Sequence, residues 1–454
     1  MIRKALNELI EWNNRKRRKP LIVWGARQVG KTYLIRDIFA EEYYPKRYIY
    51  LDFKEEDELK EFCNKTVNPS KIIEYISILK NKPIKDDTLL IFDEIQECKN
   101  IISSLKYFCQ EYPTLHVIAT GSMVRIKIQR ENKKRGVKTD DQFLFPVGKI
   151  DEITLFPMTF DEFLMNSNSA LYNKLKESYY SGKREIEESI HLLALDYLYR
   201  YLLIGGMPEP VSAYIEDKDL LETKRLLSSL YNNYLADMEL YQASPESVIR
   251  SRALFKNIYR ELNRESKNFS PGLIEDKAKN RDFASPIQWL TFAYVVHQSL
   301  MLPEHITIPL TPSKEKTFRL YLGDIGMFSF QSGINAVSFI SNEKENTLSG
   351  IFFENFVADE LKAQSIPLYY WKGKAFSEME FVVESDNKIY PIDVKRGRGN
   401  LNSLTAFSNH NKFEMAIKIS KNHYGVDKER KIVTIPFYYV SFLAEDLNKG
   451  VFTY

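Results

Sequence analysis

Residues 21–32 read LIVWGARQVGKT and decide the fold of the N-terminal part of this 454-residue chain. The apolar run LIVW has the length of a buried strand, and residues 25–32 match the pattern GxxxxGK[ST]. A helix is predicted to follow at residues 31–42, because leucine, isoleucine and phenylalanine recur there on one helical face. Strand, glycine-bounded loop and helix together predict a site that cradles phosphate groups.

The loop residues have expected roles in binding a nucleoside triphosphate, and we predict ATP. Glycines let the backbone curl so that successive N–H groups point at phosphate oxygens. Lys31 is expected to reach the β- and γ-phosphates as part of the catalytic machinery, and the Thr32 hydroxyl to ligate Mg²⁺. An ordinary glycine-containing turn is the alternative, which the matching flanks disfavour. The predicted nucleotide-binding residues are Gly25, Ala26, Arg27, Gln28, Val29, Gly30, Lys31 and Thr32.

A second stretch, TLLIFDE at residues 88–94, is an apolar strand that ends in two carboxylates. Because ligands of parallel sheets bind at the carboxyl ends of strands, both carboxylates are expected beside the phosphates. Asp93 is predicted to hold the water shell of Mg²⁺, and Glu94 to polarise the water that attacks the γ-phosphate. A capped strand end at the surface is the alternative. The pair favours an ATPase over a GTPase or a nucleotide kinase.

Further strands are predicted at residues 47–53 and 115–119. The second leads to Ser122, which is either a sensor of the γ-phosphate or the cap of the next helix. The basic segment at residues 125–138 is interpreted either as a source of an arginine finger or a polyanion contact, or as a solvated loop. The alternation of strands and helices over residues 20–157 predicts a parallel α/β sheet.

Composition and charge predict a soluble, cytoplasmic protein. The net charge is only +3, so a surface for nucleic acid has to be a local patch. Three scattered cysteines argue against a disulfide framework or a zinc site and fit a reducing compartment. The most apolar longer stretch, residues 292–302, is too short to span a membrane. The length predicts several domains.

The loop and the acidic pair belong to a series of motifs that runs in order along nearly the whole chain. The later motifs are IATGS (118–122), ITLFPMTFDEF (153–163), LIGGMPEP (203–210), RLYLGDIGMF (319–328), GIFFENFVADEL (350–361), and EMEFVV followed by IYPIDVKRG (to 397). With this series the chain resembles a bacterial and archaeal family of AAA-superfamily ATPases whose C-terminal half is catalogued as a domain of unknown function. The resemblance implies a helical lid after the core. Lys149 stands where it implies an arginine, so no arginine finger is assigned, and a ring, a dimer and a monomer all remain open.

The C-terminal part carries a second candidate site. A helix at residues 350–361 contains Glu354, and Glu380 begins an apolar strand run. Asp393 and Lys395 lie two apart in a predicted strand, so they are expected on one face. Strand-like stretches are read at residues 368–371, 378–383, 388–395, 414–419 and 431–442.

This arrangement resembles the PD-(D/E)xK fold of restriction endonucleases. The resemblance implies that Glu354, Glu380, Asp393 and Lys395 bind a second Mg²⁺ or Mn²⁺ and activate a water for phosphodiester hydrolysis. Glu380 replaces the aspartate that is usual in the fold, which puts cleavage in doubt. A metal-dependent nuclease acting on DNA and an inactive relic used for docking both remain open.

The middle of the chain is less distinctive. A helix at residues 248–263, more helix up to residue 302 and a strand at residues 319–322 resemble a winged helix, which implies DNA binding by analogy only. The predicted domains are an ATPase core (1–157), a helical lid (158–240), a winged-helix-like region (241–335) and a nuclease-like domain (336–454).

The sequence therefore supports two hypotheses about function. In the first, a Mg²⁺-dependent AAA-type ATPase is coupled to a nuclease-like domain that binds DNA or acts on it. In the second, the chain is a nucleotide-controlled switch or scaffold that binds a protein partner through a catalytically inactive docking domain.

Overall fold

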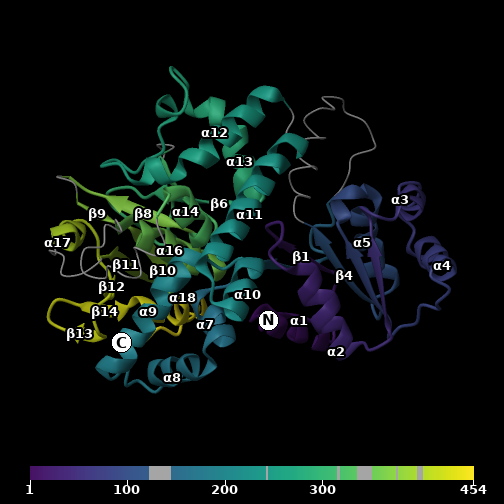
Figure 1. Cartoon of the computed structure of the whole chain (residues 1–454), viewed down its shortest axis with the longest axis horizontal. Helices are drawn as coiled ribbons and strands as arrows, with labels where there is room; N and C mark the ends of the chain where they lie inside the picture. Colours follow the sequence, from purple (N-terminus) through teal and green to yellow (C-terminus); the bar gives the residue numbers. More distant parts are fainter. Residues whose placement is uncertain (122–144, 242–243, 314–316, 335–349, 375–376, 396–401) are drawn as a thin grey trace. The chain divides into compact units, whose positions relative to one another are not determined.

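The computed structural model describes the chain except residues 122–144, 242–243, 314–316, 335–349, 375–376 and 396–401 (Figure 1). The predictions for Ser122 and for the basic segment at residues 125–138 therefore lie outside the described residues. The chain forms two compact units, residues 2–156 and residues 157–454 together with Met1. In the part of the chain that the structure describes, no helix has the length and apolar character needed to cross a membrane.

The first unit is built on a five-stranded sheet with the order β2-β3-β4-β1-β5, in which all neighbours are parallel. All five residues of β1 and of β3 are buried, which is why both read as unbroken apolar runs in the sequence. The predicted parallel α/β sheet is confirmed. The strands are β1 Leu21–Gly25, β2 Tyr48–Asp52, β3 Leu89–Asp93, β4 His116–Gly121 and β5 Asp151–Leu155.

The helix predicted after the glycine-rich loop is confirmed over most of its length. It consists of η1, Tyr33–Ala40, which has π-helical hydrogen bonding, and the short α2, Glu41–Tyr43. Its apolar face is buried through Leu34, Ile35 and Phe39, as the spacing predicts. The other helices of this unit are α1 Ala5–Asn14, α3 Asp57–Cys63, α4 Pro69–Leu79, η2 Ile95–Glu97 and α5 Lys99–Glu111.

The second unit begins with helices, and the helix predicted to continue to residue 302 is wrong in its last part. Helix α13, Ala284–Phe292, stops before Tyr294, which has a left-handed φ of 59°. The strand β6, Val296–Met301, follows, because this run pairs with β7, Phe318–Leu322, instead of extending the helix. The helices before β6 are α7 Phe160–Ser167, α8 Ser169–Tyr180, α9 Glu188–Ile204, α10 Pro208–Asp217, α11 Leu220–Tyr241, α12 Pro245–Leu262, η3 Pro271–Leu273, η4 Asn280–Phe283 and α13.

Strand β6 lies inside a four-stranded sheet of order β7-β6-β8-β9. It is antiparallel to β7 and parallel to β8, Tyr369–Lys372. Strand β9, Glu378–Met379, completes the sheet. Strands on both sides of residue 335 thus share one sheet, and the winged-helix interpretation is not confirmed.

A five-stranded sheet of order β10-β11-β12-β14-β13 forms the rest of this unit. The strand predicted at residues 431–442 holds only as far as Pro436, after which the chain turns into η5 and α18. The remaining elements are α14 Ile325–Ser332, α16 Gly350–Ala363, β10 Phe381–Ser385, β11 Lys388–Val394, α17 Asn402–Ser408, β12 Ala416–Ser420, β13 Gly425–Asp427, β14 Ile432–Pro436, η5 Phe437–Tyr439 and α18 Val440–Lys449.

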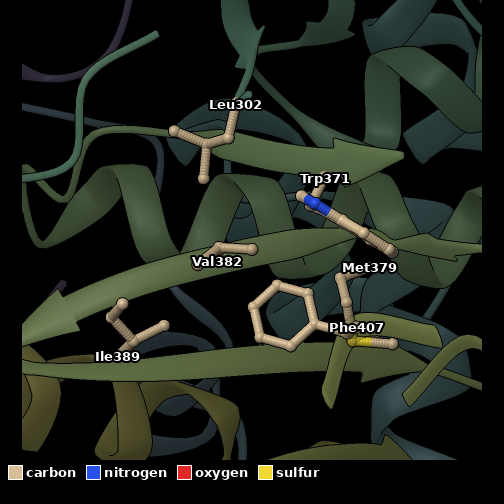
Figure 2. Close-up of a cluster of buried hydrophobic side chains, with 6 residues drawn as sticks. All are labelled: Leu302, Trp371, Met379, Val382, Ile389 and Phe407. Atoms are coloured by element: carbon tan, nitrogen blue, oxygen red, sulfur yellow. The ribbon is translucent and has the colours of Figure 1, made fainter. Parts of the chain in front are cut away.

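Figure 2 shows a hydrophobic cluster that fixes the strands carrying the C-terminal carboxylates. Met379 is fully buried in it, so Glu378, its neighbour in β9, turns to the opposite side of the strand. Trp371 packs edge-on against Phe407 and donates its indole N–H to the backbone oxygen of Glu304 at 3.0 Å. The cluster consists of Leu302, Trp371, Met379, Val382, Ile389 and Phe407.

The buried carboxylate of Asp324 links two of the sequence motifs, LIGGMPEP and RLYLGDIGMF, in the core of the second unit. Asp324 accepts hydrogen bonds from the backbone N–H of Gly206 at 2.7 Å and of Met327 at 2.9 Å, and so caps α14. A Cβ on Gly206 would lie 2.1 Å from the Met158 oxygen, so this turn requires glycine. Burial raises the pKa of Asp324 to about 6, although the backbone N–H donors oppose the shift. The LIGGMPEP and LGDIG stretches therefore hold the second unit together.

Candidate functional site

The backbone of the glycine-rich loop has the curled conformation of an anion cradle. Gln28 and Gly30 have positive φ values of 62° and 91°, the kind of backbone conformation from which successive N–H groups can form an anion cradle. Gly25 lies against strand β5, where a Cβ would come within 2.3 Å of the Leu155 oxygen. Gly25 is thus required because the backbone of β5 approaches it closely, whereas Gly30 is required because the loop curls there with a positive φ.

Lys31 lies over this loop with its ammonium held by the backbone. Its Nζ donates to the carbonyl oxygens of Gly25 at 3.1 Å and Ala26 at 2.8 Å. Burial lowers the pKa of Lys31 to about 8, and the nearby charges of Glu94 and Asp93 oppose this shift. The partners of the ammonium are uncharged carbonyls, which phosphate oxygens can replace with a gain in Coulomb energy.

Asp93 is buried at the end of β3 and is surrounded by donors. The Thr32 hydroxyl donates to its Oδ2 at 2.7 Å, which brings the two predicted metal-site residues together, and the Tyr50 hydroxyl donates to the same oxygen at 2.8 Å. Its Oδ1 accepts from the Thr120 hydroxyl and from the backbone N–H of Glu94 at 2.9 Å. All four donors are uncharged. Hydroxyl and carboxylate oxygens are the ligands that Mg²⁺ prefers, so these residues fit the predicted metal.

Glu94 lies just beyond the strand that was predicted to include it. Its backbone is left-handed, with φ of 51°, an uncommon conformation for a residue other than glycine and one that recurs at functional sites. Gln96 donates its side-chain N–H to a carboxylate oxygen of Glu94. The turn and this hydrogen bond set the position of the Glu94 carboxylate next to Asp93.

Three residues in this site were not predicted. Tyr50 and Thr120 bond Asp93, and the period of two in strand β2 could have indicated Tyr50 because β2 pairs with β3. Arg3 is buried, and its guanidinium donates to the backbone oxygens of Val29 at 3.2 Å and Phe156 at 2.6 Å. Arg3 thereby braces the loop, and nothing in the sequence specifies its partners.

The C-terminal carboxylates also converge as predicted. The Lys395 ammonium lies 2.8 Å from Asp393 Oδ1 and 3.3 Å from Glu380 Oε1. The other oxygen of Glu380 accepts the backbone N–H of Val394 at 3.1 Å. Glu380 is 3% exposed, and this burial raises its pKa above the ordinary value while the charge of Lys395 opposes the shift.

Glu354 of α16 meets side chains that the sequence did not indicate. The Lys267 ammonium donates to Glu354 Oε1 and lies 3.1 Å from Glu378 Oε1. The Arg319 guanidinium lies 2.6 Å from the other oxygen of Glu378. Burial raises the pKa of Glu378, but the charges of Arg319 and Lys267 outweigh it and lower the pKa to about 2.

These carboxylates do not fit the second metal ion that the endonuclease resemblance implies. The oxygens of Glu378 and Glu380 are each engaged by a donor, and Glu354 Oε2 is the one glutamate oxygen here that is buried without a hydrogen-bond partner among the described residues. Asp393 Oδ1 is also buried without a hydrogen-bond partner among the described residues, but the Lys395 ammonium lies 2.8 Å from it. The oxygens left open are therefore too few for Mg²⁺ or Mn²⁺. Over the described ranges, no group of three or more acidic, histidine or cysteine side chains is arranged to hold a metal.

Comparison with known families assigns the N-terminal part of the chain. Residues 17–164 match the family model described as AAA domain, so this part is an AAA-type P-loop domain. Residues 195–338 and 349–438 match two models that are each described as a domain of unknown function, DUF8612 and DUF4143. No curated protein matches the chain.

Solved structures show weaker likenesses. The Walker-type ATPase PABY2304 of Pyrococcus abyssi is 18% identical over 72% of this chain and 95% of its own, at a TM-score of 0.42. DnaA of Aquifex aeolicus with bound AMPPCP is 15% identical over 64% of this chain and 86% of its own, at a TM-score of 0.28. PCH-2 of C. elegans is 11% identical over 48% of this chain and 61% of its own, at a TM-score of 0.24. At these TM-scores the assignment of the N-terminal domain depends on the family model alone.

Proposed function

We propose that the chain is a Mg²⁺-dependent ATPase that binds ATP through residues 25–32. The observation that carries the proposal is the 2.7 Å contact between Thr32 Oγ1 and Asp93 Oδ2. It joins the end of the phosphate loop to the end of strand β3, the two places from which P-loop ATPases hold their metal. Thr32 would bind Mg²⁺ directly and Asp93 through its water shell. Bound there with ATP, Mg²⁺ neutralises charge that develops on the phosphates.

The residues of this chain have separate tasks in the proposed reaction. Lys31 exchanges its carbonyl partners for β- and γ-phosphate oxygens, which favour its charged form. Glu94 orients the attacking water and accepts its proton, and the hydrogen bond from Gln96 keeps the carboxylate in place. Tyr50 and the Thr120 hydroxyl act through Asp93 and are positioning residues.

The Glu94→Gln variant tests this proposal, with Glu97→Gln as the matched control. Loss of a general base lowers the rate by about 10²- to 10⁴-fold, so Glu94→Gln is expected to bind ATP and hydrolyse it at no more than about a hundredth of the normal rate. Glu97 lies three residues further on and pairs with Lys60 at 3.7 Å, so its variant is expected to hydrolyse normally. Normal hydrolysis by Glu94→Gln would show that the assignment of the base is wrong.

We further propose that the C-terminal region has a PD-(D/E)xK-like fold. Support comes from the paired strands β10 and β11. Lys395, directly after β11, reaches both Asp393 in β11 and Glu380 directly before β10, as the resemblance implies. DNA is the substrate or ligand that this fold implies. Cleavage would need a metal at carboxylates that do not fit one.

A nucleotide-controlled switch is the second candidate function, because the carboxylates of the C-terminal region are engaged by basic side chains. In this function the region binds DNA or a protein partner without cutting. An ATPase assay separates the two ligands. The rate is measured with and without single- or double-stranded DNA, and the rate of the Glu94→Gln variant is subtracted as background. Several-fold stimulation at moderate salt supports DNA. A Glu94-dependent rate that is indifferent to DNA supports a protein partner.

A further inference from the structure

A compact set of buried ion pairs joins four segments of the second unit. Lys267 follows helix α12, Arg319 lies in β7, Glu354 in α16 and Glu378 in β9. The side chain of Arg319 is 1% exposed, that of Glu354 4% and that of Lys267 15%. Charges this deeply buried are stable only when each has a partner of opposite sign. Here the ammonium is shared by Glu354 and Glu378, and Glu378 is shared by the ammonium and the guanidinium.

We propose that Lys267 and Arg319 are built-in cations that take the place of a divalent metal at the C-terminal carboxylates. The endonuclease-like region of this chain therefore binds no metal there and does not cleave DNA. The proposal rests on the PD-(D/E)xK-like fold proposed above only for the expectation of a metal. The ion pairs themselves are independent of that fold.

The balance of charge supports this assignment. Glu354, Glu380 and Asp393 with Lys395 alone would carry an excess of negative charge that attracts a divalent cation. Lys267 and Arg319 bring two positive charges, whereas Glu378 adds one negative charge. The complete set is close to neutral, so its electrostatic attraction for a divalent metal is small. A metal would also have to displace the ammonium and guanidinium donors that are already in place.

The two cations are held firmly in position. The Arg319 guanidinium lies 4.1 Å from the centre of the Tyr370 ring, a cation–π contact that keeps it over the ring. The segment that carries Lys267 is fixed by its next two residues. Asn268 accepts the Tyr370 hydroxyl at 2.8 Å, and Phe269 bonds the backbone of β7 and stacks on Phe318. Lys267 is thus attached to the sheet on which Arg319 lies and cannot swing away alone.

Manganese titration of the nucleotide-free full chain tests the proposal. The single variant Glu354→Gln is expected to bind the same number of Mn²⁺ ions as the wild-type protein. Lys267→Met removes the ammonium but keeps an unbranched side chain, and it is expected to gain one Mn²⁺ per chain. Adding Glu354→Gln to Lys267→Met is expected to abolish the gained site, and Lys267→Arg, which keeps the charge, is expected to gain none.

Two outcomes would overturn the proposal. One is a Mn²⁺ ion bound by the wild-type chain and lost in Glu354→Gln or Asp393→Asn. The other is Mn²⁺-dependent nicking of supercoiled plasmid by the wild-type chain that Asp393→Ala abolishes. Neither outcome depends on Lys267→Met, so both decide the matter even if that variant does not fold.

The test is separate from that of the ATPase. ATP hydrolysis, measured on the same preparations, depends on Glu94 and reports the N-terminal site. The number of bound Mn²⁺ ions without nucleotide, compared between variants of the second unit, reports the C-terminal carboxylates.

Discussion

Asp93 of the nucleotide site and Glu378 of the C-terminal carboxylates both have their two oxygens occupied by side-chain donors, but the donors differ in charge. Asp93 accepts from the hydroxyls of Thr32, Tyr50 and Thr120, uncharged donors that stabilise the carboxylate without cancelling its negative charge. Glu378 accepts from an ammonium and a guanidinium, which cancel its charge. The first arrangement is prepared for a cation and the second already contains one. The two clusters of carboxylates thus differ in what they can bind.

Removal of the built-in cation should have the largest effect on stability. Lys267→Ala leaves two buried carboxylates without their shared partner, and breaking a buried pair in this way costs about 3–5 kcal/mol. Urea unfolding of the full chain measures the loss. Lys256→Ala, an exposed lysine of helix α12, is the matched control and is expected to change stability by less than about 0.5 kcal/mol. Equal stabilities of the two variants would show that the buried pair contributes nothing.

Acid should remove part of the same stabilisation. The pKa of Glu378 is lowered from the ordinary 4.5 to about 2, so its contribution is complete above pH 4.5 and is lost as the pH falls toward 2. The difference corresponds to about 3 kcal/mol, and Glu378→Gln should lack this pH dependence. Unfolding of both proteins at several pH values between 5 and 2 tests the prediction.

An exposed pair provides the control for the acid experiment. Glu275 binds Arg250 through both oxygens, at 2.7 and 2.8 Å, but lies at the surface. Because water screens such a pair, Glu275→Gln should keep nearly all of the pH dependence of the wild-type protein. A loss as large as that in Glu378→Gln would mean that burial is not the cause.

The smallest effect is expected at the uncharged donors of Asp93. Tyr50→Phe removes one hydrogen bond to the carboxylate, worth about 1 kcal/mol, and should lower kcat about 3- to 10-fold and raise the Mg²⁺ concentration needed for half-maximal rate. Tyr48→Phe is the control, since its hydroxyl lies on the same strand but donates to Glu41 at 2.5 Å. A fall in kcat without a change in Mg²⁺ dependence would argue against a positioning role through Asp93.

The contrast between the two sites also separates what was predictable from what was not. The phosphate loop is one short stretch, and its meeting with Asp93 follows from the rule that parallel strands end at one edge, so the motif predicted both. Asp393 and Lys395 are two residues apart, and their shared face follows from the strand period. Local spacing was sufficient in each case.

Contacts between distant residues of common types were not predictable. Lys267 and Glu354 are 87 residues apart, and the chain has many other lysines that could have supplied the ammonium. The sequence of strand β6 fits a helix as well as a strand because it is a short apolar run, and its pairing with β7 and β8 decides the matter. Tertiary partners determined the outcome in both cases.

The shared sheet has a practical consequence for dissecting this chain. Backbone hydrogen bonds join Leu300 to Leu368 at 3.0 Å and Leu302 to Tyr370 at 2.8 Å, across the gap between the two families of unknown function. A recombinant fragment that begins near residue 349 would expose the β8 edge, whose unpaired N–H and C=O groups are a template for aggregation. It would also leave Glu354 without Lys267. The smallest fragment of the second unit that can be expressed in soluble form should therefore begin well before β6.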